Sequence, residues 1–147
     1  GCDDHKYLET VKKAENAGYM QYHGEQKDML PYYQMAHCVV HPSYYPEGMS
    51  NVLLEAAASG RPVIATDRSG CRETVDEGKT GYLIPIRDED ALVQALEDFL
   101  NLTWKERAEL GRAGRLKMEH EFDGQIVVQK YLDTLRDYQA SLCEVRR

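Results

Sequence analysis

The sequence lacks several features that would assign a protein to a class at once. It has no apolar run long enough to span a membrane, no secretory signal pattern and no Cys-x-x-Cys pair. Its four cysteines, Cys2, Cys38, Cys71 and Cys143, are scattered, which is typical of reduced thiols in the cytoplasm. Basic residues are outnumbered, because 18 Lys and Arg stand against 25 Asp and Glu. The resulting net charge of -7 disfavours non-specific binding to nucleic acid or anionic lipid.

The sequence does contain enough apolar residues for one core. Hydrophobic residues make up 42% of the 147 positions, and no repeat, low-complexity tract or linker divides them. We therefore predict one globular unit. Short apolar runs alternate with helical segments, which predicts an α/β fold with a Rossmann-like, doubly wound parallel sheet. We expect strands at 19–22, 38–41, 62–65 and 82–84, and helices at 3–17, 29–36, 50–59, from 72 or 73, and at 88–100, 104–118 and 125–142.

The last three helices are predicted to cover this sheet. The helix at 88–100 has a one-sided apolar stripe, which is typical of core packing. In the helix at 125–142, Tyr131, Leu135 and Tyr138 recur at helical spacing. We interpret them as a packed face rather than an aromatic binding stripe.

Two glutamates draw attention to residues 42–60, where Glu47 precedes and Glu55 lies within a predicted helix. The residues beside Glu55 are apolar on both sides, so its carboxylate is expected to be buried. A buried carboxylate needs hydrogen-bond donors, which sugar or ribose hydroxyls would supply. Ser50 or Asn51 would cap the helix, whose free amides and positive dipole end attract phosphate. These features favour a nucleotide sugar. By contrast, His37 and His41 share an i,i+4 spacing in a strand-like segment, which disfavours a metal site.

This segment resembles the signature block of retaining GT-B glycosyltransferases of family four, also called group 1. The resemblance is carried by Pro42-Ser43, Glu47-Gly48, Glu55-Ala56, Gly60-x-Pro62-Val63, Gly70-x-x-Glu73 and Gly81-Tyr82-Leu83, with seven residues between the two glutamates. It implies that the chain is the donor-binding, C-terminal half of such an enzyme.

The resemblance also implies roles for individual residues. Glu47 would be the catalytic-site residue that lies against the donor hexose, and Glu55 would hold the ribose hydroxyls. The backbone amides of Gly48, Met49 and Ser50 would meet the sugar hydroxyls or the diphosphate. Asn51 would line the diphosphate pocket or simply cap the helix. The base would lie near residues 22–30.

The chemistry implied is transfer of a hexosyl unit from a UDP- or GDP-sugar to a hydroxyl of a glycan or lipid-linked glycan, with retention. No metal or cofactor is implied, because preorganised donors stabilise the departing diphosphate. Such an enzyme works in the cytoplasm, with at most peripheral contact with the inner face of the membrane. Two alternatives are a non-catalytic nucleotide-sugar-binding module that needs a partner chain and a GT-B sugar-nucleotide epimerase. A glycosidase reading is disfavoured, because Glu55 lies well inside a helix.

The resemblance begins late in the family pattern. We therefore expect residues 1–147 to form a partial donor domain, without the acceptor domain, the first strand and its crossover, or the Arg/Lys pair that clamps the diphosphate. Catalysis by this chain alone is accordingly disfavoured. The strand expected at 19–22 would lose its neighbour and should be unpaired or displaced.

Overall fold

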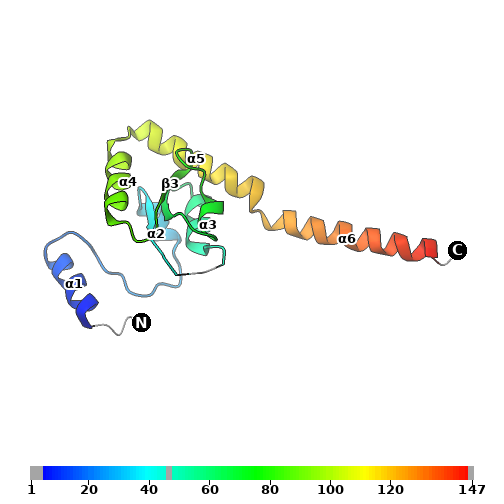
Figure 1. Cartoon of the computed structure of the whole chain (residues 1–147), viewed down its shortest axis with the longest axis horizontal. Coiled ribbons are helices and arrows are strands. Elements are labelled where there is room, and N and C mark those ends of the chain that lie inside the picture. Colours follow the sequence, from blue (N-terminus) through cyan, green and yellow to red (C-terminus); the bar gives the residue numbers. More distant parts are fainter. Residues whose placement is uncertain (1–4, 46–47, 146–147) are drawn as a thin grey trace.

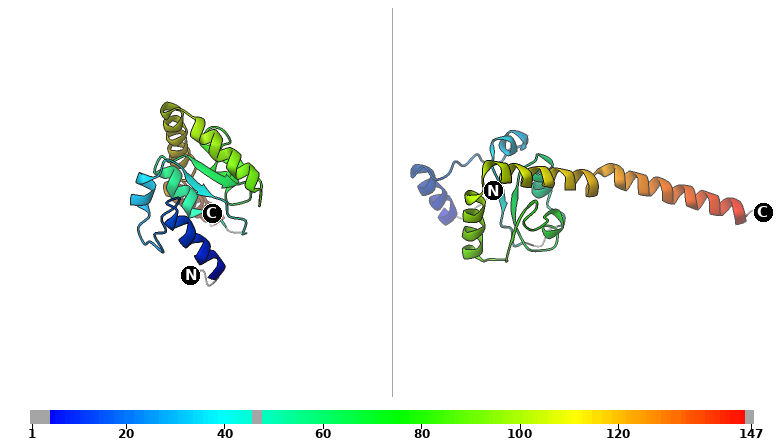
Figure 2. Two further views of the ribbon diagram at one scale, coloured as in Figure 1. Left: turned by 90° about the vertical axis from the view of Figure 1, so that its left-hand side faces the viewer. Right: turned by 90° about the horizontal axis from the view of Figure 1, so that it is seen from above.

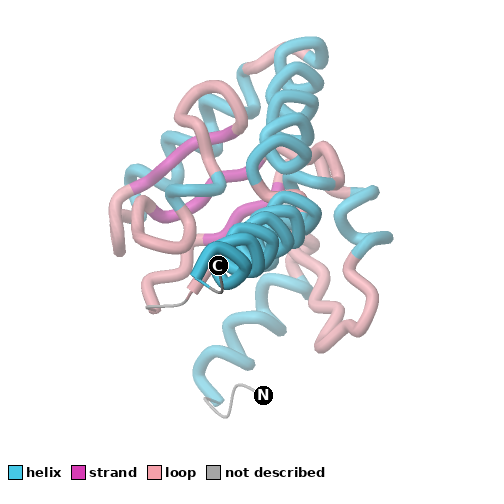
Figure 3. The backbone as a smooth tube through the Cα atoms, turned by 90° about the vertical axis from the view of Figure 1, so that its right-hand side faces the viewer, coloured by secondary structure: helices cyan, strands magenta, loops and turns pink. Residues whose placement is uncertain are grey.

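A small parallel sheet forms the centre of the fold, which a computed structural model describes over residues 5–45 and 48–145. Its strands are β1 (Val39–His41), β2 (Val63–Thr66) and β3 (Gly81–Ile84), in the order β1-β2-β3. Both pairings are parallel, with Val39 opposite Val63 and Val63 opposite Gly81. The three strands lie side by side in Figure 3. The predicted parallel α/β sheet is therefore confirmed, with strand ends shifted by one residue.

Helices cover both faces of the sheet. Every residue of β2 is therefore buried, and its side chains alternate between the two faces. Val63 and Ala65 join a core cluster with Tyr33 of α2 (Leu30–Met35) and Leu53 of α3 (Asn51–Ala58). On the opposite face, Ile64 and Ile84 pack with Ala95 and Phe99 of α4 (Glu89–Asn101). The result is the helix–sheet–helix arrangement of a doubly wound fold.

One short element and one long helix pack around this core. A 3-10 turn, η1 (Arg72–Thr74), lies between β2 and β3. Helix α5 (Trp104–Glu121) starts with a capping box between Thr103 and Glu106 and packs along α3. Near its end, Lys117 binds Asp76 and Glu121, each at 2.9 Å. Burial opposes the charge of Lys117, but these hydrogen bonds outweigh it and raise the pKa of its ammonium group.

The segment expected to form a strand at 19–22 has no ladder partner in the described part of the chain. It follows α1 (His5–Asn16), which lies to the side of the sheet in Figures 1 and 2. The backbone N–H of Tyr22 donates instead to Glu15 at 2.7 Å, and Tyr19 is 87% exposed. The predicted strand at 19–22 therefore does not form, whereas the expectation that this segment would be unpaired or displaced is confirmed.

Helix α6 (Gly124–Val145) departs from the expectation that it would cover the sheet. It continues away from the domain beyond α5 and ends far from the sheet (Figure 1). Tyr131, Leu135 and Tyr138 are 70%, 58% and 62% exposed, so the predicted packed face is wrong. The spacing shows that these side chains share one face of α6, but it carries no information on whether another part of the fold covers that face. None of the described helices is both long and apolar enough to cross a bilayer.

Candidate functional site

Helix α3 divides its residues between the core and an open surface. Leu53, Ala56 and Ala57 are buried, whereas Val52 and Glu55 lie on an exposed face. The prediction that Glu55 would be buried is therefore wrong. The physical reason is that α3 is a single short helix whose packing against the sheet and α5 uses only part of its circumference. The remaining stripe opens to solvent despite its apolar neighbours.

Glu55 lines an open cavity of about 870 Å³, which we call the Glu55 pocket. The pocket lies between the segment that leads into α2, the C-terminal half of α3, and α5. Its lining residues are Lys27, Asp28, Met29, Leu30, Tyr33, Gln34, Glu55, Ala58, Ser59, Gly60, Arg61 and Arg115. Residues 27–30, the end of the segment expected to lie near the base, and the expected ribose-binding carboxylate thus line one cavity. Such a cavity is large enough for a nucleotide-sized ligand.

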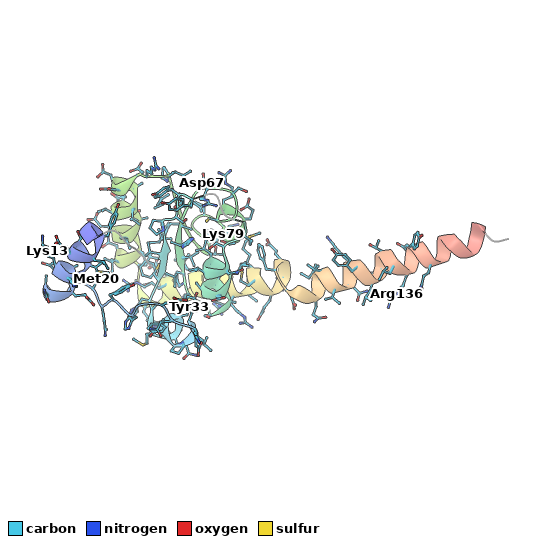
Figure 4. All side chains as sticks on the ribbon, turned by 90° about the horizontal axis from the view of Figure 1, so that it is seen from below. Lys13, Met20, Tyr33, Asp67, Lys79 and Arg136 are labelled. Carbon is cyan, nitrogen blue, oxygen red and sulfur yellow. The ribbon has the colours of Figure 1, made fainter. Side chains whose placement is uncertain are left out.

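Tyr33 connects α2 to α3 at the wall of the pocket. Its hydroxyl donates a hydrogen bond to Oε2 of Glu55 at 3.1 Å. The Tyr33 ring is buried in the core, and the residue is labelled on α2 in Figure 4. Burial, together with this hydrogen bond and the negative charge of Glu55, raises the pKa of Tyr33 to about 12. The Tyr33 hydroxyl therefore stays protonated and donates a hydrogen bond to the carboxylate throughout the neutral range.

Two arginines bring positive charge to the same pocket. Arg61 Nη1 donates to the carbonyl of Ala36 at 3.2 Å, and its buried Nε has no partner among the described residues. Arg115 Nη1 donates to the carbonyl of Ala58 at 2.6 Å, which holds α5 against the end of α3. The guanidinium groups lie near a cavity that also holds a carboxylate, so the pocket can accept a ligand with both hydroxyl and anionic groups.

The sequence reasoning did not assign Tyr33, Arg61 or Arg115 to the site. Arg61 stands inside the Gly60-x-Pro62 motif, so that motif was a signal that could have identified it. Tyr33 and Arg115 carry no comparable signal, because they lie outside residues 42–60 and belong to none of the motifs.

The start of α3 is arranged differently from the prediction at one position. Ser50 occupies the N-cap position and is only 3% exposed, but its side chain makes no capping hydrogen bond. Its backbone N–H donates to the carbonyl of Gly70 at 2.9 Å, so the Ser50 amide faces the protein instead of a ligand. Gly48, Met49 and Asn51 are exposed at the same helix start. Of the residues at this helix start that were predicted to meet the donor, these three are open to solvent.

The Gly70-x-x-Glu73 motif explains this arrangement in structural terms. Gly70 adopts a left-handed φ of +87°, which favours glycine, and its N–H donates to Glu73 Oε2 at 2.7 Å. Hydrogen bonds from the backbone N–H groups of Glu73 and Gly70 lower the pKa of the Glu73 carboxyl, against the opposing effect of burial. The motif thus shapes the turn that holds Ser50.

Glu47, the residue expected to contact the donor hexose, lies outside the described residues. Its convergence with Glu55 on one cavity stays a prediction. His37 and His41 do not gather with other ligands, since the described ranges contain no group of three or more His, Cys, Asp or Glu side chains that could hold a metal ion.

Polar atoms at the carboxyl edge of the sheet lack partners. Thr66 Oγ1, at the end of β2, and His41 Nε2, at the end of β1, are buried and form no hydrogen bond within the described part of the chain. Ligands of open parallel sheets bind at this edge. Neither residue lines the Glu55 pocket, and Thr66 lines a separate cavity together with Tyr44 and Arg87.

A model of the family described as Glycosyl transferases group 1 matches residues 1–101. The capsular polysaccharide biosynthesis glycosyltransferase CapM of Staphylococcus aureus is 33% identical over 100 residues, which are 68% of this chain and 26% of that protein. The GDP-mannose-dependent alpha-(1-6)-phosphatidylinositol monomannoside mannosyltransferase of Mycobacterium tuberculosis is 34% identical over 95 residues, which are 65% of this chain and 24% of that protein. The chain spans about a quarter of the length of the curated relatives it matches.

Solved structures share the arrangement of helices and strands. Sucrose-phosphate synthase from Thermosynechococcus elongatus matches with a TM-score of 0.78 and 30% identity over 92% of this chain and 34% of that chain. Anabaena Alr3699/HepE, solved in complex with UDP-glucose, matches with a TM-score of 0.76 over 92% of this chain and 38% of that chain. Its identity is 21%, so this second likeness concerns the fold alone.

Proposed function

Because the chain belongs to the Glycosyl transferases group 1 family and has the fold of the GT-B glycosyltransferases, we propose that it binds the nucleotide-sugar donor of a retaining hexosyltransferase. The donor is a UDP- or GDP-sugar. The single observation that carries this proposal is the Glu55 pocket, in which a carboxylate, a buried tyrosine hydroxyl and two arginines surround one open cavity.

In this proposal each part of the site meets one part of the donor. Glu55 accepts hydrogen bonds from the ribose hydroxyls, and the segment before α2 lies beside the base. The exposed start of α3, at Gly48, Met49 and Asn51, meets the diphosphate and sugar, because helix-start amides attract phosphate. Glu47 lies against the hexose.

The reaction transfers the hexosyl unit from the diphosphate to an acceptor hydroxyl with retention. The diphosphate leaves with negative charge, which preorganised N–H donors and cations stabilise more strongly in the transition state than in the ground state. No metal ion or cofactor takes part in this scheme. Arg61 and Arg115 are on the pocket wall, where Arg61 adds positive potential and the charge of Arg115 is offset by its ion pair with Glu119 at 2.6 Å. The acceptor is a glycan or lipid-linked glycan. This assignment follows the names of relatives in polysaccharide and phosphatidylinositol mannoside synthesis.

Isothermal titration of the 147-residue chain with UDP and with GDP tests the donor site. Glu55→Ala should weaken binding of the preferred nucleotide by about tenfold or more, because a hydrogen bond to a charged acceptor contributes roughly 1.5–3 kcal/mol. Glu97→Ala is the matched control, since Glu97 is an exposed glutamate on α4, away from the pocket. Equal affinity of Glu55→Ala and the control, or no binding of either nucleotide at millimolar concentration, would contradict the proposal.

A second measurement separates the two glutamates. In an enzyme that contains this domain, Glu47→Ala should lower the turnover number while the affinity for the free nucleotide stays within about twofold, because its partner is the sugar. A parallel loss of free-nucleotide binding would remove Glu47 from the hexose position.

A further inference from the structure

We infer that Tyr33 is a positioning residue, whose hydroxyl fixes the Glu55 carboxylate so that the pocket selects ribonucleotides over 2′-deoxyribonucleotides. The inference rests on the proposed function, in which Glu55 receives the ribose. It concerns how the carboxylate is held and what that orientation distinguishes.

Packing holds the Tyr33 side chain in a fixed position, whereas the Glu55 side chain would be mobile without its hydrogen bond from Tyr33. Tyr33 is 4% exposed and belongs to the core cluster with Leu53 and Ala56, so its ring is held by packing. Glu55 is exposed and has no other hydrogen bond to a described side chain than the one from Tyr33. The rigid partner therefore directs the flexible one, across 22 positions in the sequence.

The hydrogen bond leaves most of the carboxylate available. An ionised carboxylate can accept about four hydrogen bonds, and Tyr33 uses one of them at Oε2. The Oε1 atom and the remaining sites of Oε2 are left for a ligand in the pocket. Because the side chain is already held before binding, less rotamer entropy is lost when the ligand arrives.

A ribose presents two neighbouring hydroxyls, and a carboxylate held in one orientation can accept from both. A 2′-deoxyribose presents only one of them. A fixed carboxylate therefore distinguishes the two sugars, whereas a carboxylate free to rotate into water loses much of this preference. The raised pKa of Tyr33, about 12, keeps the hydroxyl protonated, so the donor is present at any pH in the physiological range.

The experiment compares UDP with 2′-deoxy-UDP, and GDP with 2′-deoxy-GDP, by isothermal titration of the 147-residue chain. The unmodified chain should bind the ribonucleotide about tenfold more tightly than its deoxy form. Tyr33→Phe keeps the buried ring and removes only the hydroxyl, and it should reduce this preference to about threefold or less. Affinity for the deoxynucleotide should change by less than about twofold.

Tyr32→Phe is the matched control. Tyr32 is the neighbouring tyrosine on α2, and its ring packs edge-on against His23, 4.9 Å between centroids, with no hydrogen bond to Glu55. The preference of Tyr32→Phe for the ribonucleotide over its deoxy form should equal that of the unmodified chain. A purely structural role of Tyr33 predicts a different result, namely that both nucleotides weaken equally and the ratio is unchanged.

The Glu55→Ala arm separates failure of the inference from failure of the proposed function. If Glu55→Ala abolishes the ribose preference and Tyr33→Phe leaves it intact, the positioning role is refuted and the donor site stands. If neither variant changes the preference, or the unmodified chain has none, both the inference and the ribose assignment of Glu55 are refuted.

Discussion

Helix α5 passes close to the turn that follows α3 at a glycine, and replacement of this glycine has a predictable cost. Gly111 of α5 faces Gly60, which follows α3 and takes a left-handed φ of +70°. A Cβ atom at Gly111 would overlap the carbonyl oxygen of Gly60 and would lie 3.4 Å from Pro62 Cδ. The overlapped atoms belong to the backbone, so no side-chain rotation can relieve the contact. Gly111→Ala should therefore force α5 away from α3.

The magnitude follows from two opposing terms. Overpacking of a tight contact costs about 1–3 kcal/mol. Alanine is favoured over glycine in a helix interior by about 1 kcal/mol. Gly114, one turn further along α5, provides the matched control, because a Cβ there would meet its nearest neighbour, Ala57 Cβ, at an ordinary 3.7 Å. Gly114→Ala gains the same propensity term without the overlap, so the difference between the two variants isolates the steric cost.

Urea unfolding of the two variants measures this difference directly. With an m-value of about 2 kcal/mol/M, a steric cost of about 2 kcal/mol separates the two midpoints by about 1 M. Gly114→Ala should unfold at or above the midpoint of the unmodified chain, and Gly111→Ala should unfold below Gly114→Ala. Coincident midpoints would refute the reasoning, because the overlap would then be relieved at no cost.

Two further predictions concern pH and a helix start. The pKa of Tyr33 is about 12 in the folded chain against 10.0 ordinarily, so the folded state holds this proton more tightly. The contribution of Tyr33 to the free energy of unfolding should therefore be constant below pH 10 and fall by up to about 2–3 kcal/mol toward pH 12. Tyr33→Phe should show a smaller alkaline loss in urea titrations at pH 9 and 11, and an equal loss in both proteins would contradict the shift. Thr103→Ala removes the side-chain oxygen that caps α5 and should cost about 1 kcal/mol, a decrease of about 2–4 °C in melting temperature. Thr134→Ala, in the exposed middle of α6, is the control for Thr103→Ala. Equal melting temperatures of the two variants would contradict a stabilising role of the Thr103 cap.

The sheet was predictable from sequence because its signals are local. Each strand is a short apolar run bounded by Gly, Pro or polar residues, and such a run is typical of a strand that is buried on both faces, as in a parallel sheet. The helix-ending role of Gly60 was readable for the same reason, since a residue with positive φ at a helix end is usually glycine. The structure moved the boundaries of three predicted strands by single residues and has no strand at 19–22.

The site was less predictable because its contacts are not local. The apolar neighbours of Glu55 suggested burial, but composition averages over the whole circumference of a helix. Which stripe is covered depends on where the sheet and α5 lie, and neither is encoded in residues 50–59. The hydrogen bond from Tyr33 reaches Glu55 from another helix. The same limit explains α6, whose apolar stripe was visible in the sequence while the absence of an opposing surface in the described fold was not.

Helix packing and site geometry are consequently linked through α5. Gly111 and Arg115 are four residues apart, so they lie on the same face of α5, and that face meets the end of α3. The small residue lets the helices approach, and the approach brings Arg115 within 2.6 Å of the Ala58 carbonyl on the pocket wall. Arg61 follows directly on the Gly60 carbonyl that Gly111 accommodates. Arg115 also pairs with Glu119 at 2.6 Å, and Arg61 donates to the carbonyl of Ala36. Because both arginines lie beside the contact between Gly111 and Gly60, an added methyl group at Gly111 should shift them at the pocket wall as well as destabilise the fold.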